Sequence, residues 1–280
     1  MSNSGLSFAI LVSCLVAWGS ASPAAAQTKD WKISESVTYE RGDFGTGTET
    51  TTVYIPTVLK RYFEKGDISL VVPYIHIEGS GAVITVDGVP QRSKKNGRGN
   101  SNGSGGGPSS TTSVSSVSNG GIGDVLLKGS YYLLEETAQP LNLSLVGKIK
   151  FPTASHGRNL GTGKFDEGFG AEASKEILKD WTLFTDAYYT ILGTPAGADT
   201  FRNQFAFDVG AGYQIISPLN LSLFFEQKTA IVAGTSAPRN VNLNAEYQLT
   251  HDFRLFGTAL AGLSDGSSDY GLTAGVSLRF

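Results

Sequence analysis

Apolar and polar residues alternate at every second position along most of the chain, from residue 31 to the C-terminus. In the last segment the apolar positions are Tyr270, Leu272, Ala274, Val276, Leu278 and Phe280. The residues between them are small or polar. A soluble, half-buried strand rarely keeps this alternation for so long, whereas a tilted strand that crosses a bilayer needs roughly 9 to 11 residues. The pattern therefore predicts transmembrane β-strands.

About twelve such segments follow one another. They are residues 31–41, 51–61, 67–78, 122–134, 141–152, 167–177, 181–192, 203–215, 219–231, 240–249, 253–263 and 269–280. The connections between them are alternately short and long, which is expected of an even-stranded barrel with both termini in the periplasm and its long loops outside the cell. The predicted fold is all-β, a transmembrane antiparallel up-and-down β-barrel of about twelve strands.

Two charged residues disagree with this pattern. Glu35 and Lys175 fall on the apolar face of their segments. A Lys in the middle of the bilayer costs about 2–4 kcal/mol. We therefore expect these residues near an interface, or a bulge in their strands. Residues 171–178 also fit a helical pattern.

The N-terminus has the form of an export signal. An apolar run from Leu6 to Trp18 precedes Ala24-Ala25-Ala26, which predicts a secretory signal peptide over residues 1–26 and a mature barrel over residues 27–280. A lipoprotein signal ending at Cys14 is the alternative, but the apolar run continues past that residue. Cleavage after Ala26 leaves no cysteine, and hence no disulfide and no thiol chemistry.

The longest connection, residues 79–121, contains a tract of Gly, Ser, Asn and Thr from Asn96 to Gly121. Such a tract buries too little surface to offset its ordering entropy, so we expect a long, disordered external loop at about residues 90–120. A basic cluster lies within this connection, formed by Arg92, Lys94, Lys95 and Arg98. It is either a solvated surface, or a gate or a contact to anionic lipopolysaccharide.

The composition agrees with two opposed faces. The chain of 280 residues has 35 Gly and only 17% charged residues, and its mean hydropathy of -0.06 is what lipid-facing and lumen-facing residues give on average. A net charge of -3 argues against a nucleic-acid partner. No apolar run after residue 30 is long enough for a membrane-spanning helix.

The inward positions of the predicted strands carry acids and bases in nearly equal numbers. The predicted lumen-lining residues are Asp124, Lys128, Lys148, Lys150, Glu172, Glu176, Asp186, Asp208, Glu226, Lys228, Glu246, Arg254 and Arg279. The bases gather on residues 122–152 and 253–280, and the acids lie between them. Two interpretations stay open: ion pairs that fill the lumen, or a transverse field across a narrow pore that orients a dipolar or small aromatic solute.

The histidines do not indicate a metal or catalytic site. His76, His156 and His251 fall in a strand end, a long loop and a short turn, so they cannot converge on one ion. The sequence predicts no catalytic residue, no metal and no cofactor. The glycine motifs at residues 161–165 and 168–173 lack the context of phosphate-binding loops and are typical of turns.

Three stretches together resemble a known family: residues 72–75 (VPYI), 121–124 (GIGD) and 148–153 (KIKFPT) followed by 160–163 (LGTG). They resemble the outer-membrane family named after the MetA pathway of phenol degradation, whose members are usually described as transporters. That family typically has Gly where this chain has Ala154. The resemblance implies an outer-membrane barrel that passes hydrophobic or aromatic compounds. The C-terminal pattern of Tyr270, Val276, Leu278 and Phe280 also resembles the insertion signature of such barrels.

The leading hypothesis is a monomeric outer-membrane channel, not an enzyme, for passive passage of small, hydrophobic or aromatic solutes. Its expected partners are outer-membrane lipid and lipopolysaccharide, the assembly machinery of that membrane, and the small-molecule solute. Two alternatives come from other classes: a lipid-modifying enzyme that uses His76, and a structural or adhesive barrel that uses the long loop.

Overall fold

The computed structural model describes residues 8–9, 16–17, 30–94, 116–195 and 199–280. Most of the expected signal peptide and residues 95–115 of the expected external loop lie outside the described residues. Two short strands, β1 (Phe8–Ala9) and β2 (Val16–Ala17), pair with each other. The helical structure in the described part of the chain is one 3₁₀ turn (His156–Arg158), and no helix there is long and apolar enough to cross a membrane.

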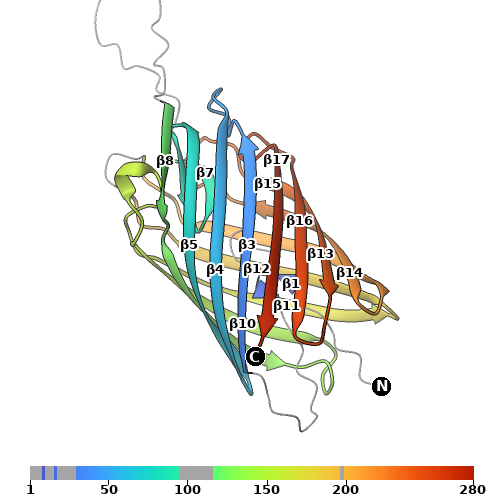
Figure 1. The fold of residues 1–280 in the computed structure, drawn as a ribbon. Coiled ribbons are helices and arrows are strands. Elements are labelled where there is room, and N and C mark those ends of the chain that lie inside the picture. Colours follow the sequence, from blue (N-terminus) through green and yellow to red (C-terminus); the bar gives the residue numbers. More distant parts are fainter. Residues whose placement is uncertain (1–7, 10–15, 18–29, 95–115, 196–198) are drawn as a thin grey trace, which may run out of the picture.

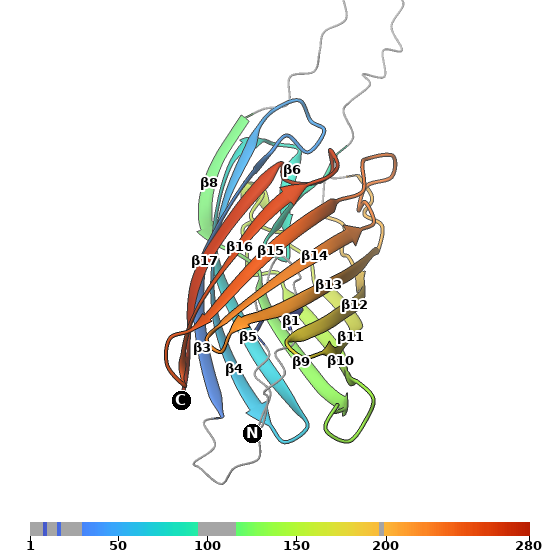
Figure 2. The ribbon, with the colours of Figure 1, turned by 90° about the vertical axis from the view of Figure 1, so that its right-hand side faces the viewer.

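Twelve long antiparallel strands form a closed barrel, which confirms the predicted fold (Figures 1 and 2). They are β3 (Trp31–Gly42), β4 (Thr50–Phe63), β5 (Gly66–Ser80), β9 (Val125–Leu134), β10 (Asn142–Phe151), β11 (Asp166–Leu178), β12 (Trp181–Ile191), β13 (Gln204–Ile216), β14 (Leu219–Lys228), β15 (Arg239–Gln248), β16 (Phe253–Gly262) and β17 (Tyr270–Arg279). Strands adjacent in this order pair with each other, and β17 pairs with β3. This last pairing closes the barrel.

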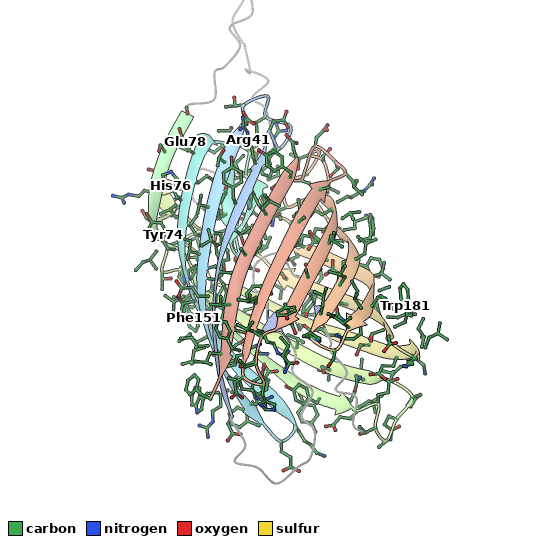
Figure 3. All side chains as sticks on the ribbon, turned by 45° about the vertical axis from the view of Figure 1, so that its right-hand side comes forward. Arg41, Tyr74, His76, Glu78, Phe151 and Trp181 are labelled. Atoms are coloured by element: carbon green, nitrogen blue, oxygen red, sulfur yellow. The ribbon has the colours of Figure 1, made fainter. Side chains whose placement is uncertain are left out.

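The alternation in sequence becomes two faces of the barrel wall. On β14, Leu223 is 54% exposed and points outward, whereas its neighbour Phe224 is 2% exposed and points inward. Figure 3 draws the side chains on the ribbon and labels Phe151 and Trp181. Trp181 contacts Tyr213 at the short-turn end of the barrel, and Phe151 contacts Phe165 at the other end. Aromatic residues at both ends of an apolar outer surface are typical of transmembrane barrels.

The C-terminal residues lie on this outer surface. Tyr270, Val276, Leu278 and Phe280 are exposed by 45%, 41%, 43% and 52%. The N–H of Phe280 donates to the carbonyl of Trp31 at 2.8 Å, and the N–H of Trp31 donates to the carbonyl of Phe280 at 3.0 Å. The last residue of the chain is therefore hydrogen-bonded to the first residue of the barrel.

The fourth wall strand is divided into two pieces, β8 (Ser116–Ile122) and β9. Both pieces pair with β5, and the register changes between them, because Tyr74 faces Ile122 and Val71 faces Leu126. This differs from the expected disordered loop at about residues 90–120. Its end, residues 116–121, is a strand because its backbone pairs with the upper part of β5.

The two charged outliers have different surroundings. Lys175 is exposed near the end of β11 and donates to the carbonyl of Pro140 at 2.6 Å, and a register shift follows between Glu176 and Leu178. Glu35 is exposed within a stretch of regular register between β3 and β4. The segment of residues 171–178, whose pattern also fits a helix, belongs to strand β11.

Candidate functional site

A β-hairpin from the connection after β5 is buried at the end of the barrel that bears the long connections. It consists of β6 (Val83–Val86), labelled in Figure 2, and β7 (Val89–Arg92), labelled in Figure 1, joined by the turn Asp87-Gly88. Both turn residues have positive φ, 53° at Asp87 and 82° at Gly88. This matches a two-residue type I′ turn, for which Asp-Gly is a preferred sequence. All four residues of β6 are buried.

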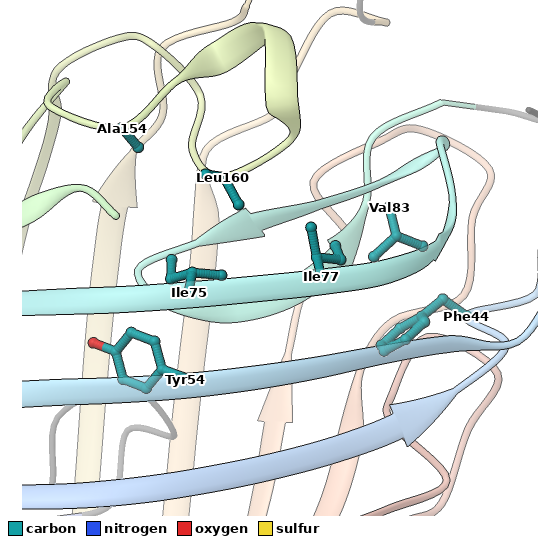
Figure 4. Packing of buried hydrophobic residues seen from close by; sticks show 7 residues of the cluster. All are labelled: Phe44, Tyr54, Ile75, Ile77, Val83, Ala154 and Leu160. Carbon is teal, nitrogen blue, oxygen red and sulfur yellow. The ribbon is translucent and has the colours of Figure 1, made fainter. Parts of the chain in front are cut away.

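Apolar contacts hold both faces of the hairpin. On one side Val83 joins a cluster with residues of β4, β5 and the neighbouring connections, namely Phe44, Tyr54, Ile75, Ile77, Ala154 and Leu160 (Figure 4). On the other side, Ile84 and Val86 pack with Leu192, Phe201, Ile231 and Val232. The hairpin is thus enclosed between the wall strands and four connections, those after β3, β10, β12 and β14.

The tip of the hairpin forms an ion pair with the barrel wall. A carboxylate oxygen of Asp87 lies 2.5 Å from Nζ of Lys148 on β10. Burial alone would raise the pKa of Asp87, but the charge and hydrogen bond of Lys148 outweigh it, with help from the charges of Lys150 and Lys228, so that the pKa lies below its ordinary value. Asp87 therefore remains charged and bound to Lys148.

Two amide side chains bind the hairpin elsewhere. Nε2 of Gln204 on β13 donates to Oε1 of Gln91 at 2.9 Å. Nδ2 of Asn159, in the connection after β10, donates to the carbonyls of Gly81 at 3.2 Å and Val83 at 3.1 Å. These contacts join the hairpin to two further parts of the barrel mouth.

The basic cluster in the long connection is only partly described. Nη1 of Arg92, at the end of the hairpin, donates to the carbonyl of Gly45 at 2.7 Å, and its Nε donates to the carbonyl of Lys94 at 2.8 Å. Lys95 and Arg98 lie outside the described residues. Arg92 therefore serves the anchoring of the hairpin.

Inside the barrel, the bases form one row across neighbouring strands. Each residue in the row faces the next one in the register of the sheet, with Ser69 on β5 between the second and third bases. The bases in order are Lys148, Lys128, Lys60, Lys32 and Arg279. They occupy strands β10, β9, β4, β3 and β17.

The acids form a second row on the intervening strands. Glu172 on β11 faces Asp186 on β12, which faces Asp208 on β13, which faces Glu226 on β14. All four side chains are buried, with exposures of 5%, 3%, 1% and 0%. The barrel thus has one basic wall and one acidic wall.

Many inward charges form ion pairs. The pairs are Lys60–Asp67 at 2.9 Å, Lys128–Glu172 at 3.0 Å, Lys150–Asp124 at 2.8 Å, Lys150–Asp166 at 2.6 Å, Lys228–Glu226 at 3.2 Å and Arg254–Glu246 at 2.9 Å. Most predicted lumen-lining residues therefore lie inside the barrel and have a partner. Glu176 is exposed at the end of β11, and Asp186 and Asp208 are in no ion pair among the described residues.

Sequence reasoning did not identify the hairpin. Its anchors Asp87, Gln91 and Asn159 are missing from the predicted residues, because the alternation predicts loops over both connections that contain them. The signal was present: Val83-Ile84-Thr85-Val86 and Val89 flank Asp87-Gly88, and Asp-Gly between alternating apolar residues is a strong short-range hairpin signal.

The histidines lie apart from the interior rows. His76 is half-buried on β5, near Tyr74 and Glu78 (Figure 3), and His251 lies in the turn before β16 beside Asp252. Among the described residues there is no group of three or more His, Cys, Asp or Glu side chains that could hold a metal ion.

Comparison with known structures shows the same fold. The COG4313 outer membrane channel from Pseudomonas putida F1 has a TM-score of 0.64 at 11% identity, over 92% of this chain and 100% of that chain. The translocator domain of the autotransporter NalP from Neisseria meningitidis has a TM-score of 0.53 at 9% identity, over 90% of this chain and 88% of that chain. A comparison with curated proteins found no significant match.

The family comparison covers most of the barrel. The model of the family described as "Putative MetA-pathway of phenol degradation" matches residues 67–280. This range begins at the second residue of β5 and includes every later strand through β17. The match includes the hairpin and the acidic row. The chain therefore belongs to the MetA-pathway of phenol degradation family.

Proposed function

We propose that this protein is a passive outer-membrane channel for small, hydrophobic or aromatic solutes, and that the hairpin restricts its path. The observation that carries the proposal is the hairpin itself, buried inside a closed barrel with a polar interior. A barrel of eight strands is filled by side chains and one of sixteen leaves an open channel. With twelve strands and an inserted hairpin, a narrow path is expected.

The two charged walls support a role in orienting the solute. The basic row, which runs from Lys148 to Arg279, and the acidic row, which runs from Glu172 to Glu226, lie on opposite groups of strands. Such an arrangement produces a field across the path, which aligns a molecule with a dipole. Phenol and related aromatic compounds have such a dipole, and the family description names phenol degradation. We infer that the predicted interior residues set this field, apart from Glu176, which is exposed at the end of β11.

Several finer features belong to the same proposal. Export would remove residues 1–26, and Tyr270, Val276, Leu278 and Phe280 would be the residues that the assembly machinery recognises. The exposed apolar belt would contact outer-membrane lipid, and the mouth would face lipopolysaccharide. We propose a monomer because the barrel closes on itself through β3 and β17.

Reconstitution tests the proposal directly. The full chain and a variant with residues 82–93 replaced by a short Gly-Ser linker are placed in planar bilayers, and the uptake of phenol is followed in liposomes. We expect ion current and solute flux from the native protein, and larger ones from the variant. If neither the native protein nor the variant gave ion current or solute flux, the channel proposal would be contradicted. Lipid hydrolysis that is abolished by His76→Ala would establish the enzyme alternative instead.

A further inference from the structure

The acidic wall contains two carboxylates that the described residues leave uncompensated. Glu172 has Lys128 at 3.0 Å and Glu226 has Lys228 at 3.2 Å. Asp186 and Asp208, which lie between them, form no ion pair among the described residues. Like charges directly opposite on neighbouring strands destabilise a sheet. The row therefore contains two carboxyl groups that have no base of their own among the described residues.

Asp208 is the most isolated member of the row. Its side chain is 1% exposed, and neither of its carboxylate oxygens has a hydrogen-bond partner in the part of the chain that the structure describes; the same holds for one oxygen of Asp186. A buried carboxylate without a hydrogen bond or a counter-charge is costly. A cation between Asp186 and Asp208 would remove this cost.

Aromatic rings lie on the same inward face as the acidic row, two residues further along their strands. Phe184 and Phe224 point inward from β12 and β14, and each lies two residues along its strand from an acid of the row, Asp186 and Glu226 respectively. Their ring centroids are 5.4 Å apart. They meet across β13 because Gly210 lies between them, where a Cβ atom would lie 2.4 Å from the Phe224 ring.

Carboxylates next to aromatic rings suit one class of ligand. The face of an aromatic ring attracts a cation, and organic ammonium groups add apolar surface that packs against the ring. We propose that the Asp186–Asp208 pair, with Phe184 and Phe224, is a binding site for organic ammonium ions inside the barrel. This inference deepens the proposed function, on which it rests, by naming a class of solute that the channel prefers.

The test uses benzyltrimethylammonium as the probe and benzyl alcohol as its neutral counterpart. In planar bilayers with KCl, the probe should block the current of the native protein, and the alcohol should not. Asp208→Asn should raise the blocking concentration by about tenfold, and Phe224→Leu should raise it by a few-fold. Glu40→Gln is the matched control, because it removes a buried acid on β3 that lies outside the acidic row and accepts a hydrogen bond from Ser268 at 2.5 Å. Its block should equal that of the native protein.

A second measurement does not depend on current. Equilibrium dialysis of the probe against the folded protein in detergent should show binding by the native chain and by Glu40→Gln, and loss of binding by Asp208→Asn. Migration of the unheated barrel on gels verifies that each variant is folded. Equal binding by native and Asp208→Asn protein, or equal effects of the probe and the alcohol, would overturn the inference. Current without any block would overturn it while leaving the channel intact, whereas absence of current and flux would contradict the proposed function.

Discussion

Nζ of Lys148 on β10 lies 2.5 Å from the carboxylate of Asp87, so that a residue of the wall binds the tip of the inserted hairpin. Removing one member of a buried ion pair leaves the other without compensation, which costs about 3–5 kcal/mol. We expect Lys148→Met to release the tip, seen as frequent transitions to larger currents in single-channel recordings. The exposed Lys179, in the turn after β11, provides the control Lys179→Met. Identical recordings from both variants would exclude a role of the pair.

Replacing the hairpin should widen the path more than releasing its tip does. A linker in place of residues 82–93 removes Val83, Ile84 and Val86 from their apolar clusters. We expect a several-fold increase in single-channel conductance and faster liposome uptake of larger solutes. The closed ring of wall strands does not include β6 or β7, so the variant should still fold as a barrel. A conductance equal to that of the native protein would show that the narrowest point lies elsewhere.

Substitution of Gly88 should prevent docking without removing any contact residue. Gly88 has a φ of 82°, and a Cβ atom there would lie 2.4 Å from the ring of Tyr54. Gly88→Ala is therefore expected to shift the current toward that of the hairpin deletion. Gly147→Ala on β10 is the control, because a Cβ atom there meets nothing within 4 Å. If both variants conduct like the native protein, the hairpin tolerates an altered tip.

The pH dependence of the current should reflect Asp87. The charge of Lys148 outweighs burial and holds the pKa of Asp87 below its ordinary value. The ion pair of Asp87 therefore contributes fully to hairpin docking at any pH above the ordinary pKa of an Asp. This contribution is lost as the pH falls through the lowered pKa of Asp87. We expect a constant conductance from pH 7 to about 4, the ordinary range of an Asp, and an increase only at lower pH. Asp87→Asn should lack this increase, and an increase of the native current already at pH 6 would contradict this assignment.

The outer face should reject charge. Leu223 is 54% exposed on the apolar surface of β14, and an Arg at the middle of a bilayer-facing strand costs about 2–4 kcal/mol. Leu223→Arg is expected to lower the urea concentration that unfolds the barrel in lipid vesicles. Phe165, 59% exposed just before β11, gives the control Phe165→Arg. Equal unfolding midpoints would place Leu223 outside the hydrocarbon layer.

The strands of the barrel wall and their two faces were predictable, because the alternation within each strand's own sequence separates outward from inward residues. The alternation from Tyr270 to Phe280 fixes which residues point outward without any knowledge of the neighbours. The division between β8 and β9 was not predictable in this way. It depends on pairing with β5 and on the lack of a side chain at Gly123, where a Cβ atom would lie 2.5 Å from Ile75.

The alternation of apolar and polar residues does not predict the partners of the interior charges. Alternation correctly places Lys148 and Glu226 on inward positions, but it does not state what lies between them. In the structure Lys148 binds Asp87 and Glu226 lies 3.2 Å from Lys228. Asp87 comes from a segment whose placement depends on Val83, Ile84 and Val86, which pack on several other connections. Such contacts between distant segments leave no periodicity in the sequence.

Asn159 ties the connection after β10 to the backbone of the hairpin, while Phe201 and Val232 from two other connections pack against it. The connections at this end of the barrel therefore form one interlocking unit, and a change in one of them alters the support of the others. Grafting a single loop from a related barrel should weaken the packing of the hairpin and its neighbouring connections, even when that loop packs well in its own protein. Transfer of solute preference between relatives is expected only when these segments are exchanged together.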